Sequence, residues 1–584
     1  MQKAQEAGKK MDEAVAEEQI RINEINSKLE TAWDGTVAKK FARGTGEVDD
    51  PYIIENASQL AYFAAVVNGK VESENLPTGL TDITFAGKYV SIVNSINLGN
   101  REFTPIGYGG NSATDSNADV FTKGTIFQGT LDGKNNVITG LKIGNEDMQQ
   151  RQGVGLVGVL GEFGTVKNVV VYDGVIKAAW AVGGIVGASK GTIENCRNDV
   201  NVTAVKSNTD SGTNVGGIVG YTSELARITN CTNNGIIKSD TSTAGGIVGW
   251  MYSGESISGC KNYGTIIANE TRAGGVVGSI KTGNITNCNN SGTITAHNQQ
   301  AGGMVGTMEN GSITNCENSG EVKTEVSNLA GGMVGLQKGG NITGCSNSGT
   351  ITAHSQSSGG MVGKMENGSI TNCENSGEVK TEVSHFAGGM VGWQIGGSVT
   401  GCSNSGTITS ISQMAGGITG RADAGSVSNC YNKGNIESKS DGIRGISGGI
   451  VGGLNGANLN DVFNSGTVKV GNYNGNSNAT KNVDTVGGIV GLQTKKTIVN
   501  AYNKGEVILP ANAEAQDVKG GVVGQKTGGS VTNTYYYGLA DSTLLGIGTG
   551  STTDDKASLT QNIWNTLNEF INWCKSNSKY VNVE

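Results

Sequence analysis

The chain has 584 residues, of which 94 are glycine and 4 are proline, and its formal net charge is −8. The scarcity of proline excludes collagen, which needs many prolines together with glycine at every third position. An acidic surface repels phosphate, so we expect no nucleic-acid partner. The sequence contains no run of apolar residues long enough for a membrane-spanning helix, so it predicts no such helix of its own.

The N-terminal part of the chain has a helical pattern followed by a mixed region. Residues Ala4–Leu29 place apolar side chains three or four positions apart, which predicts a long helix within residues 1–31. For residues 32–150 we expect a cap with a helix at Ala57–Asn68 and strands at Lys88–Val93 and Phe127–Ile143. A solenoid needs such caps because its terminal strands would otherwise leave an open edge.

Residues 151–538 consist of repeats. The motif Gly-Gly-apolar-Val-Gly, with small variations, begins twelve times between Gly183 and Gly520. Its spacing is nearly constant in the central repeats, which begin at Gly245, Gly274, Gly302, Gly331, Gly359, Gly388 and Gly416. Met308–Ser327 recurs without change at Met365–Ser384, two repeats later. Repeats of this size bury their apolar faces only by stacking on their neighbours.

A second motif, Ser-Ile-Thr-Asn-Cys-x-Asn-x-Gly-x-Ile, lies inside each repeat. Cys288, Asn290, Gly292 and Ile294 alternate with polar residues, which is typical of a strand with one buried face. We therefore predict an all-β protein, a parallel β-helix (β-solenoid) of about 13 coils. Two or three short strands are expected in each repeat.

Residues at the same phase of a solenoid lie above one another, so the sequence predicts ladders. Eleven asparagines should face inward, each amide donating to the carbonyl of the next rung. They are Asn198, Asn233, Asn262, Asn290, Asn318, Asn347, Asn375, Asn404, Asn432, Asn464 and Asn503.

Nine cysteines share another phase: Cys196, Cys231, Cys260, Cys288, Cys316, Cys345, Cys373, Cys402 and Cys430. Stacked Cβ atoms lie roughly 4.8 Å apart, whereas a disulfide needs about 3.8 Å, so we expect buried reduced thiols. No Cys-x-x-Cys pair exists to suggest zinc. Met304, Met333, Met361 and Met390 share a third phase, which is either core or an adaptable contact surface.

The C-terminal residues 539–584 are predicted to form a second cap. Leu559–Cys574 is amphipathic and should form a helix there.

We expect no catalytic residue, metal or cofactor. The candidate groups are duplicated instead of unique: His297 matches His354, and Glu317 matches Glu374. Asp115, Asn117 and Asp119 have a spacing that suits calcium, but the following glycine and the bidentate glutamate are missing. A polar loop is the simpler interpretation.

A binding role is suggested by the residue that follows each Gly-Gly-x-Val-Gly motif. This position varies between repeats and should therefore face outward. It holds Tyr221, Trp250 and Trp393, and exposed aromatic rings stack on sugars or fill a partner's pocket. The alternative is that a neighbouring loop partly covers these rings.

The two motifs together resemble the GLUG repeat family, over Val154 to about Gly538. The resemblance implies an extracellular bacterial protein, often an adhesin. Some IgA-cleaving metallopeptidases share these repeats, but their His-Glu-x-x-His motif is missing here, since the three histidines precede Asn298, Ser355 and Phe386. Lys3–Gln19 is similar to the segment after the membrane half of the first helix in type IV pilin-like proteins.

The pilin-like similarity implies a removed apolar anchor, which would be the only contact with a membrane, and self-assembly through the N-terminal helix. The sequence therefore predicts a non-enzymatic bacterial cell-surface protein, an adhesin or pilin-like subunit whose solenoid attaches to a host glycan or surface protein. A structural spacer without a ligand is the first alternative, and a polysaccharide-degrading β-helix enzyme is the second.

Overall fold

The computed structural model describes residues 31–110, 120–145, 151–206, 212–326, 328–383, 385–411, 413–439, 445–471, 483–511, 513, 515–537, 544–549, 556–559, 569 and 572. These residues form a parallel β-solenoid of about 13 coils with few helices, as the sequence predicts. The predicted helix Ala4–Leu29 and nearly all of Leu559–Cys574 lie outside the described residues.

The chain divides into two compact units. The first comprises Met1–Ser211, Gly217–Gly220 and Thr229–Gly235, and the second comprises Gly212–Gly216, Tyr221–Ile228 and Ile236–Glu584. No helix among the described residues is long and apolar enough to span a membrane.

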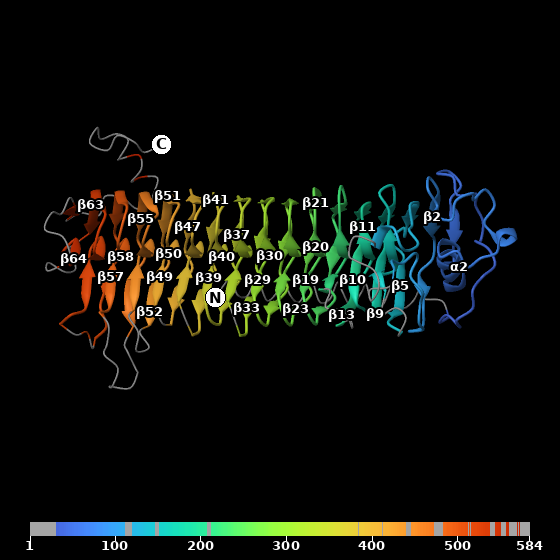
Figure 1. Ribbon diagram of the computed structural model, residues 1–584, viewed down its shortest axis with the longest axis horizontal. Coiled ribbons are helices and arrows are strands. Elements are labelled where there is room, and N and C mark those ends of the chain that lie inside the picture. The colour runs from blue at the N-terminus through green and yellow to red at the C-terminus, as the bar shows by residue number, and fades with distance from the viewer. Residues whose placement is uncertain are drawn as a thin grey trace, which may run out of the picture. The chain divides into compact units, whose positions relative to one another are not determined.

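Helix α2 (Ala57–Val67) belongs to the first unit (Figure 1) and confirms the helix expected at Ala57–Asn68. Its N-terminus is capped by Asn56, which accepts a hydrogen bond from the main-chain N–H of Gln59 (3.1 Å). Its buried face includes Phe63, whose ring lies 5.0 Å from that of Phe85 and 5.4 Å from that of Phe127. The helix is therefore held by an aromatic core.

Strands of the first unit pair in parallel. β1 (Tyr52–Ile54), β2 (Tyr89–Ile92), β4 (Thr130–Asp132) and β8 (Thr165–Lys167) follow one another in register, and β5 (Val137–Ile143) pairs with β9 (Val170–Ala178). The prediction of one continuous strand at Phe127–Ile143 is wrong. Lys134 and Asn135 have φ angles of 51° and 60° and form a turn that separates β4 from β5.

Each central coil of the second unit, up to β48 (Ile408–Ser410), contains five short strands. One coil has β24 (Arg272–Gly274), β25 (Val277–Ile280), β26 (Gly283–Thr286), β27 (Asn289–Asn290) and β28 (Ile294–Ala296). The first two belong to separate sheets, and the last three share a third sheet. Five strands exceed the two or three expected, because turns before Cys288 and at Gly292 divide the third side.

Consecutive coils pair in register, like residue on like residue. Val277 pairs with Val305, Asn290 with Asn318, and Ile294 with Val322. Figure 1 shows strands of the Gly-Gly sheet in successive coils. In the second unit this sheet consists of β14 (Asn214–Gly216), β19 (Thr243–Gly245), β24, β29 (Gln300–Gly302), β34 (Leu329–Gly331), β39 (Ser357–Gly359), β44 (Phe386–Gly388), β49 (Met414–Gly416), β53 (Ile446–Gly448), β57 (Thr485–Gly487) and β61 (Val518–Gly520).

The strands that follow the Gly-Gly corner form the next sheet. In the second unit they include β20 (Val248–Met251), β25, β30 (Val305–Met308), β35 (Val334–Gln337), β40 (Val362–Met365), β45 (Val391–Gln394), β50 (Thr419–Ala422), β54 (Val451–Leu454), β58 (Val490–Gln493), β62 (Val523–Lys526) and β64 (Ile547–Thr549). The corner itself requires glycine. A Cβ atom on Gly274 would overlap the carbonyl oxygen of Val277, and one on Gly275 would overlap that of Gly303.

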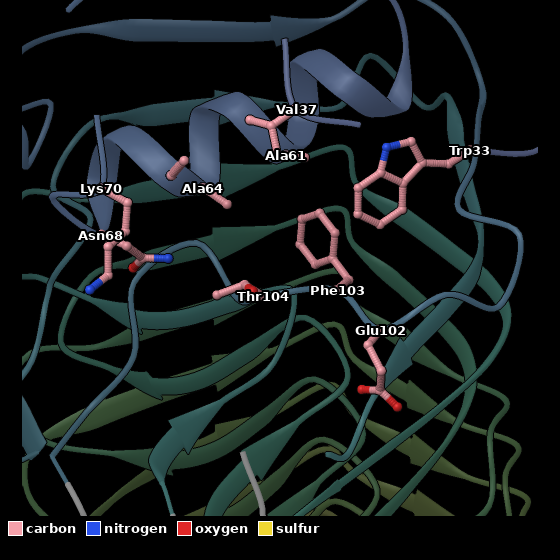
Figure 2. A pocket seen from close by; sticks show the side chains of 10 residues that line it. Trp33, Val37, Ala61, Ala64, Asn68, Lys70, Glu102, Phe103 and Thr104 are labelled. Atoms are coloured by element: carbon pink, nitrogen blue, oxygen red, sulfur yellow. The ribbon is translucent and has the colours of Figure 1, made fainter. Parts of the chain in front are cut away.

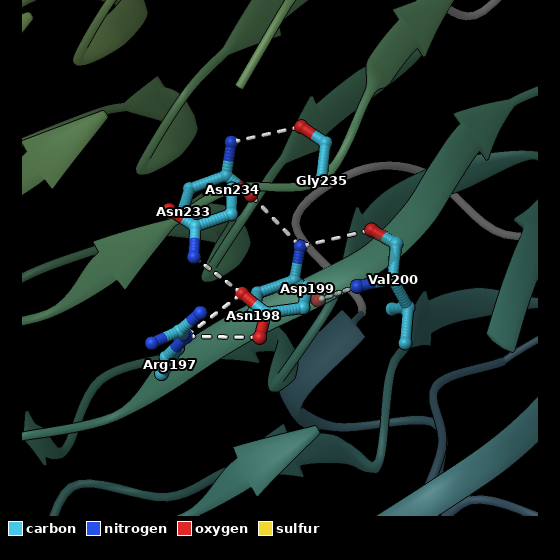
Figure 3. Close-up of polar contacts among 7 residues, drawn as sticks. All are labelled: Arg197, Asn198, Asp199, Val200, Asn233, Asn234 and Gly235. Carbon is cyan, nitrogen blue, oxygen red and sulfur yellow. Dashed lines mark hydrogen bonds and ion pairs between the residues drawn. The ribbon is translucent and has the colours of Figure 1, made fainter. Parts of the chain in front are cut away.

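The predicted asparagine ladder is confirmed. Figure 3 shows it in the first unit, where Asn198 Nδ2 donates to Asn233 Oδ1 (2.8 Å) and to the carbonyl oxygen of Val200 (3.0 Å). In the second unit Asn262 donates in the same way to Asn290 (2.7 Å). The acceptor between rungs is the side-chain oxygen, and the second hydrogen of each amide binds a main-chain oxygen two residues later. The buried amides are thus satisfied.

The nine cysteines from Cys196 to Cys430 are buried free thiols, as predicted. The main-chain N–H of Cys288 points to Cys316 Sγ at 3.4 Å, and Cys316 Sγ donates to the Thr314 carbonyl oxygen at 3.3 Å. Hydrogen bonds to the neighbouring sulfur atoms, together with burial, raise the pKa of the Cys316 thiol. The predicted methionine ladder is core, because its four side chains are 0% exposed.

Candidate functional site

Two positions flank each Gly-Gly corner of the second unit, one before it and one after it. We call the surface that they form the corner strip. The positions before the corner hold Asn214, Thr243, Arg272, Gln300, Leu329, Ser357, Phe386, Met414, Ile446, Thr485 and Val518. Those after it hold Tyr221, Trp250, Ser279, Thr307, Leu336, Lys364, Trp393, Arg421, Gly453, Leu492 and Gln525.

Side chains before and after the corner touch one another. The rings of Phe386 and Trp393 lie 5.7 Å apart, and Arg421 Cζ lies 5.3 Å from the Phe386 ring centroid. Thr307 Oγ1 donates to Gln300 Oε1 at 3.5 Å. A residue before the corner therefore contacts the residue after it in its own coil and in the next coil. Many residues of the corner strip are buried by these contacts, whereas Trp250, Arg272 and Gln300 stay partly exposed.

The structure brings Tyr221, on β15 (Val219–Thr222), and Trp250, on β20, together with a third ring, Tyr252. We call these three the aromatic cluster. Ring centroids are 5.9 Å apart for Tyr221 and Trp250, 5.8 Å for Trp250 and Tyr252, and 6.4 Å for Tyr221 and Tyr252. Lys281 Nζ lies 4.1 Å from the Tyr252 ring centroid.

Exposure differs within the aromatic cluster. Tyr221 is 8% exposed, so the expectation that its ring faces solvent is wrong, because the other two rings pack against it. Trp250 is half-buried and Tyr252 is 37% exposed. Sequence reasoning missed Tyr252, although its position two residues after Trp250 indicates the same face of the chain.

Trp393 lies apart from the aromatic cluster, five strands farther along the same sheet, or roughly 24 Å away. Its indole ring stands between two cations, with Lys364 Nζ at 5.1 Å and Arg421 Cζ at 5.8 Å from the centroid. Its Nε1 donates to Asp423 Oδ2 (2.8 Å). These contacts occupy the ring surfaces that a ligand would use.

Arg272, on β24, is a charged strip residue with a buried atom left unpartnered by the residues that the structure describes. Its Nε atom is buried and has no hydrogen-bond partner among the described residues. Burial lowers the pKa of its guanidinium, and the charge of Glu309 acts in the opposite direction. By contrast, the Arg421 Nε donates to Asp423 Oδ1 at 2.8 Å. Arg272 is thus a half-buried cation without an ion pair in the described part of the chain.

The histidine candidates form a duplicated surface pattern. His297 Nδ1 lies 2.9 Å from Glu325 Oε2, and His354 Nδ1 lies 3.2 Å from Glu382 Oε2. The hydrogen bond with His297 lowers the pKa of the Glu325 carboxyl. Both pairs are well exposed, which confirms the solvated face predicted for this part of the repeat.

The described residues contain no group of three or more His, Cys, Asp or Glu side chains arranged to hold a metal. The calcium-like spacing of Asp115, Asn117 and Asp119 lies outside those residues.

The first unit has a small pocket beside helix α2, shown in Figure 2. Its volume is about 140 Å³, and it is lined by Trp33, Phe103 and the alanines of the helix, with Lys70 and Glu102 at its rim. The Trp33 and Phe103 rings are 6.2 Å apart. Ligand pockets usually enclose about 300 Å³ or more, so we do not choose this pocket as the functional site.

Comparison with known proteins agrees with the repeat pattern. The GLUG motif matches residues 178–203, 211–238, 269–295 and 412–437. These repeats carry the GLUG motif. A relative, halomucin from Haloquadratum walsbyi (strain DSM 16790 / HBSQ001), is 30% identical over 226 residues, which is 38% of this chain. The chain spans only 2% of halomucin's length.

One solved structure is similar over 68% of this chain and 80% of its own. It is named as a "putative immunoglobulin A1 protease" from Bacteroides ovatus, with 17% identity and a TM-score of 0.28. At this level of similarity we draw nothing from it about activity.

Proposed function

We propose that the protein is a non-enzymatic, extracellular cell-surface protein that attaches to glycans. The observation that supports this most is the aromatic cluster, where Trp250 and Tyr252 stay partly open to solvent on a solenoid whose other outward positions are mostly small, polar or charged. Aromatic rings at such a site stack on the apolar faces of sugars. We therefore place the contact at Trp250 and Tyr252, and count Trp393 as a weaker candidate because its ring faces are covered.

A surface location is supported by the GLUG motif and by the similarity to halomucin. Within that location, the role of an adhesin is our proposal. The pilin-like interpretation of Lys3–Gln19 stays a prediction, since residues 1–30 lie outside the described part and none of the comparisons reported above supports it.

A glycan array tests this function. We expect the wild-type chain to bind at least one glycan. The double variant W250A/Y252A should bind that glycan at least about tenfold more weakly, because stacking contributes about 1 kcal/mol for each of the two rings. Tyr263, a 55% exposed tyrosine outside the corner strip, provides the matched control. Y263A should bind like the wild type.

Two other outcomes favour the alternatives. Absence of binding to any glycan would favour the spacer, which the regular coils of the second unit also support. Release of reducing ends from a bound polysaccharide would favour the enzyme. We propose no catalytic role, because the His–Glu pairs are duplicated.

A further inference from the structure

We propose that the corner strip next to the aromatic cluster binds an acidic saccharide, and that Arg272 recognises its anionic group. This inference rests on the proposed attachment to glycans and adds the chemical class of the glycan. It follows from the position of Arg272, from its lack of an ion pair and from the polar side chains around it.

Strand register places Arg272 close to the aromatic cluster. Trp250 pairs with Ser279 on the next strand of its sheet, and Arg272 begins the coil to which Ser279 belongs. In an equivalent coil, Phe386 before the corner touches Trp393 after it. Arg272 should therefore lie between Ser279 and Thr307, one to two strand spacings, or roughly 5 to 10 Å, beyond Trp250. In agreement, a Cβ atom on Gly306, the residue before Thr307, would lie 3.1 Å from the Cβ atom of Arg272. Adjoining sugars of one chain can reach both side chains.

The guanidinium of Arg272 suits an anionic ligand. Its planar set of N–H donors fits a carboxylate or sulfate group through two parallel hydrogen bonds. A half-buried cation is costly without a partner, and an incoming anion would supply one. The other cations of the strip are engaged within the protein, since Lys364 Nζ binds Glu366 Oε1 (2.9 Å) and Arg421 binds Asp423.

One acidic side chain acts on Arg272 from nearby. The carboxylate of Glu309 attracts the guanidinium, but its Oε1 lies 3.3 Å from Lys338 Nζ. Glu309 is therefore shared with a lysine and leaves Arg272 available for an external anion.

The surroundings of Arg272 are polar and small. It lies in register with Thr243 and Gln300, and the equivalent-coil contacts place it beside Thr307. Thr243 and Thr307 are each 2% exposed, so the half-buried Gln300 is the neighbour whose amide is open to a sugar hydroxyl.

Isothermal titration calorimetry on the full chain tests the proposal. The probes are hexagalacturonate and a hyaluronan hexasaccharide, which supply carboxylates, a heparin hexasaccharide, which supplies sulfates, and neutral maltohexaose. We expect at least one acidic probe to bind more tightly than maltohexaose. R272Q should weaken that binding by at least about tenfold, as expected for a lost charged hydrogen bond, and should change maltohexaose binding less than about twofold.

R421Q is the matched control, because Arg421 already forms an ion pair with Asp423. The affinity of the R421Q variant for the acidic probe should stay within about twofold of the wild type. Equal circular-dichroism melting curves for the wild type and R272Q would show that folding is not the cause. Unchanged acidic binding in R272Q, or binding of maltohexaose alone, would overturn this inference and leave the proposed function standing. Binding to an array glycan but to none of the acidic probes would also overturn this inference, and binding to none of the probes or array glycans would contradict both.

Discussion

The carboxyl group of Glu255 is enclosed in the second unit, directly after the aromatic cluster in sequence. The side chain is 0% exposed, and its Oε1 accepts hydrogen bonds from the main-chain N–H groups of Ser253 (2.8 Å) and Tyr252 (3.1 Å). Burial raises its pKa from 4.5 to about 7, although these two hydrogen bonds act in the opposite direction.

This shift predicts a pH-dependent stability. The pKa of Glu255 is higher in the folded state than in the unfolded state. Its contribution to the free energy of unfolding is therefore fully present below about pH 4.5 and is lost as the pH rises through 7. The loss amounts to up to about 3 kcal/mol in the free energy of unfolding. We expect E255Q to match the wild type near pH 4.5 and to exceed its stability at pH 8.5, as measured by urea unfolding. Parallel pH profiles for the two proteins would contradict the shift.

At the scale of strands and corners, the residue before the ladder cysteine lies between two strands in each central coil. Asn287 and Asn315 have φ angles of 53° and 52°, and Gly259, Gly344 and Gly401 take the same left-handed conformation in other coils. Asparagine and glycine are the residues that adopt this conformation most readily. The alternation of these two residue types in the sequence was therefore a usable signal for the extra strand break.

A substitution at this corner should destabilise the coil through its backbone alone, because the Asn315 side chain is exposed. We expect N315V to lower the free energy of unfolding by about 2 kcal/mol, since a β-branched residue resists positive φ. N315G should stay within about 0.5 kcal/mol of the wild type, because glycine occupies this phase naturally. Thermal melting of the two variants checks this, and equal melting temperatures would show that φ does not limit stability here.

The ladders could be predicted from the sequence because stacking fixes which side chains meet. Asn290 must lie on Asn318 once the length of the repeat is established, and its burial follows from period 2. The candidate site was only partly predictable. The burial of Tyr221 depends on Tyr252 in another coil, and the isolation of Arg272 depends on which carboxylates the corner brings near. Neither property is encoded in local propensity or spacing.

For the repeat array of the second unit, like-on-like stacking implies that whole coils are interchangeable. Thr307 is followed by Met308, and the segment Met308–Ser327 is identical to Met365–Ser384. Deletion of residues 308–364 therefore joins Thr307 to Met365 and preserves the junction sequence while it removes two coils. Because each coil contacts only its neighbours, the coils at the junction gain a neighbour with the same ladder residues, and all other coils keep their partners.

We expect this two-coil deletion to fold, with a β-type circular-dichroism spectrum and a melting temperature only slightly below that of the wild type. Removal of residues 308–321 is the control, since this segment is half of one coil. It would place strands of different sheets above one another and expose the ladder asparagines. The half-coil deletion should therefore lose cooperative unfolding. Equal behaviour of the two deletions would mean that register between coils does not determine the fold.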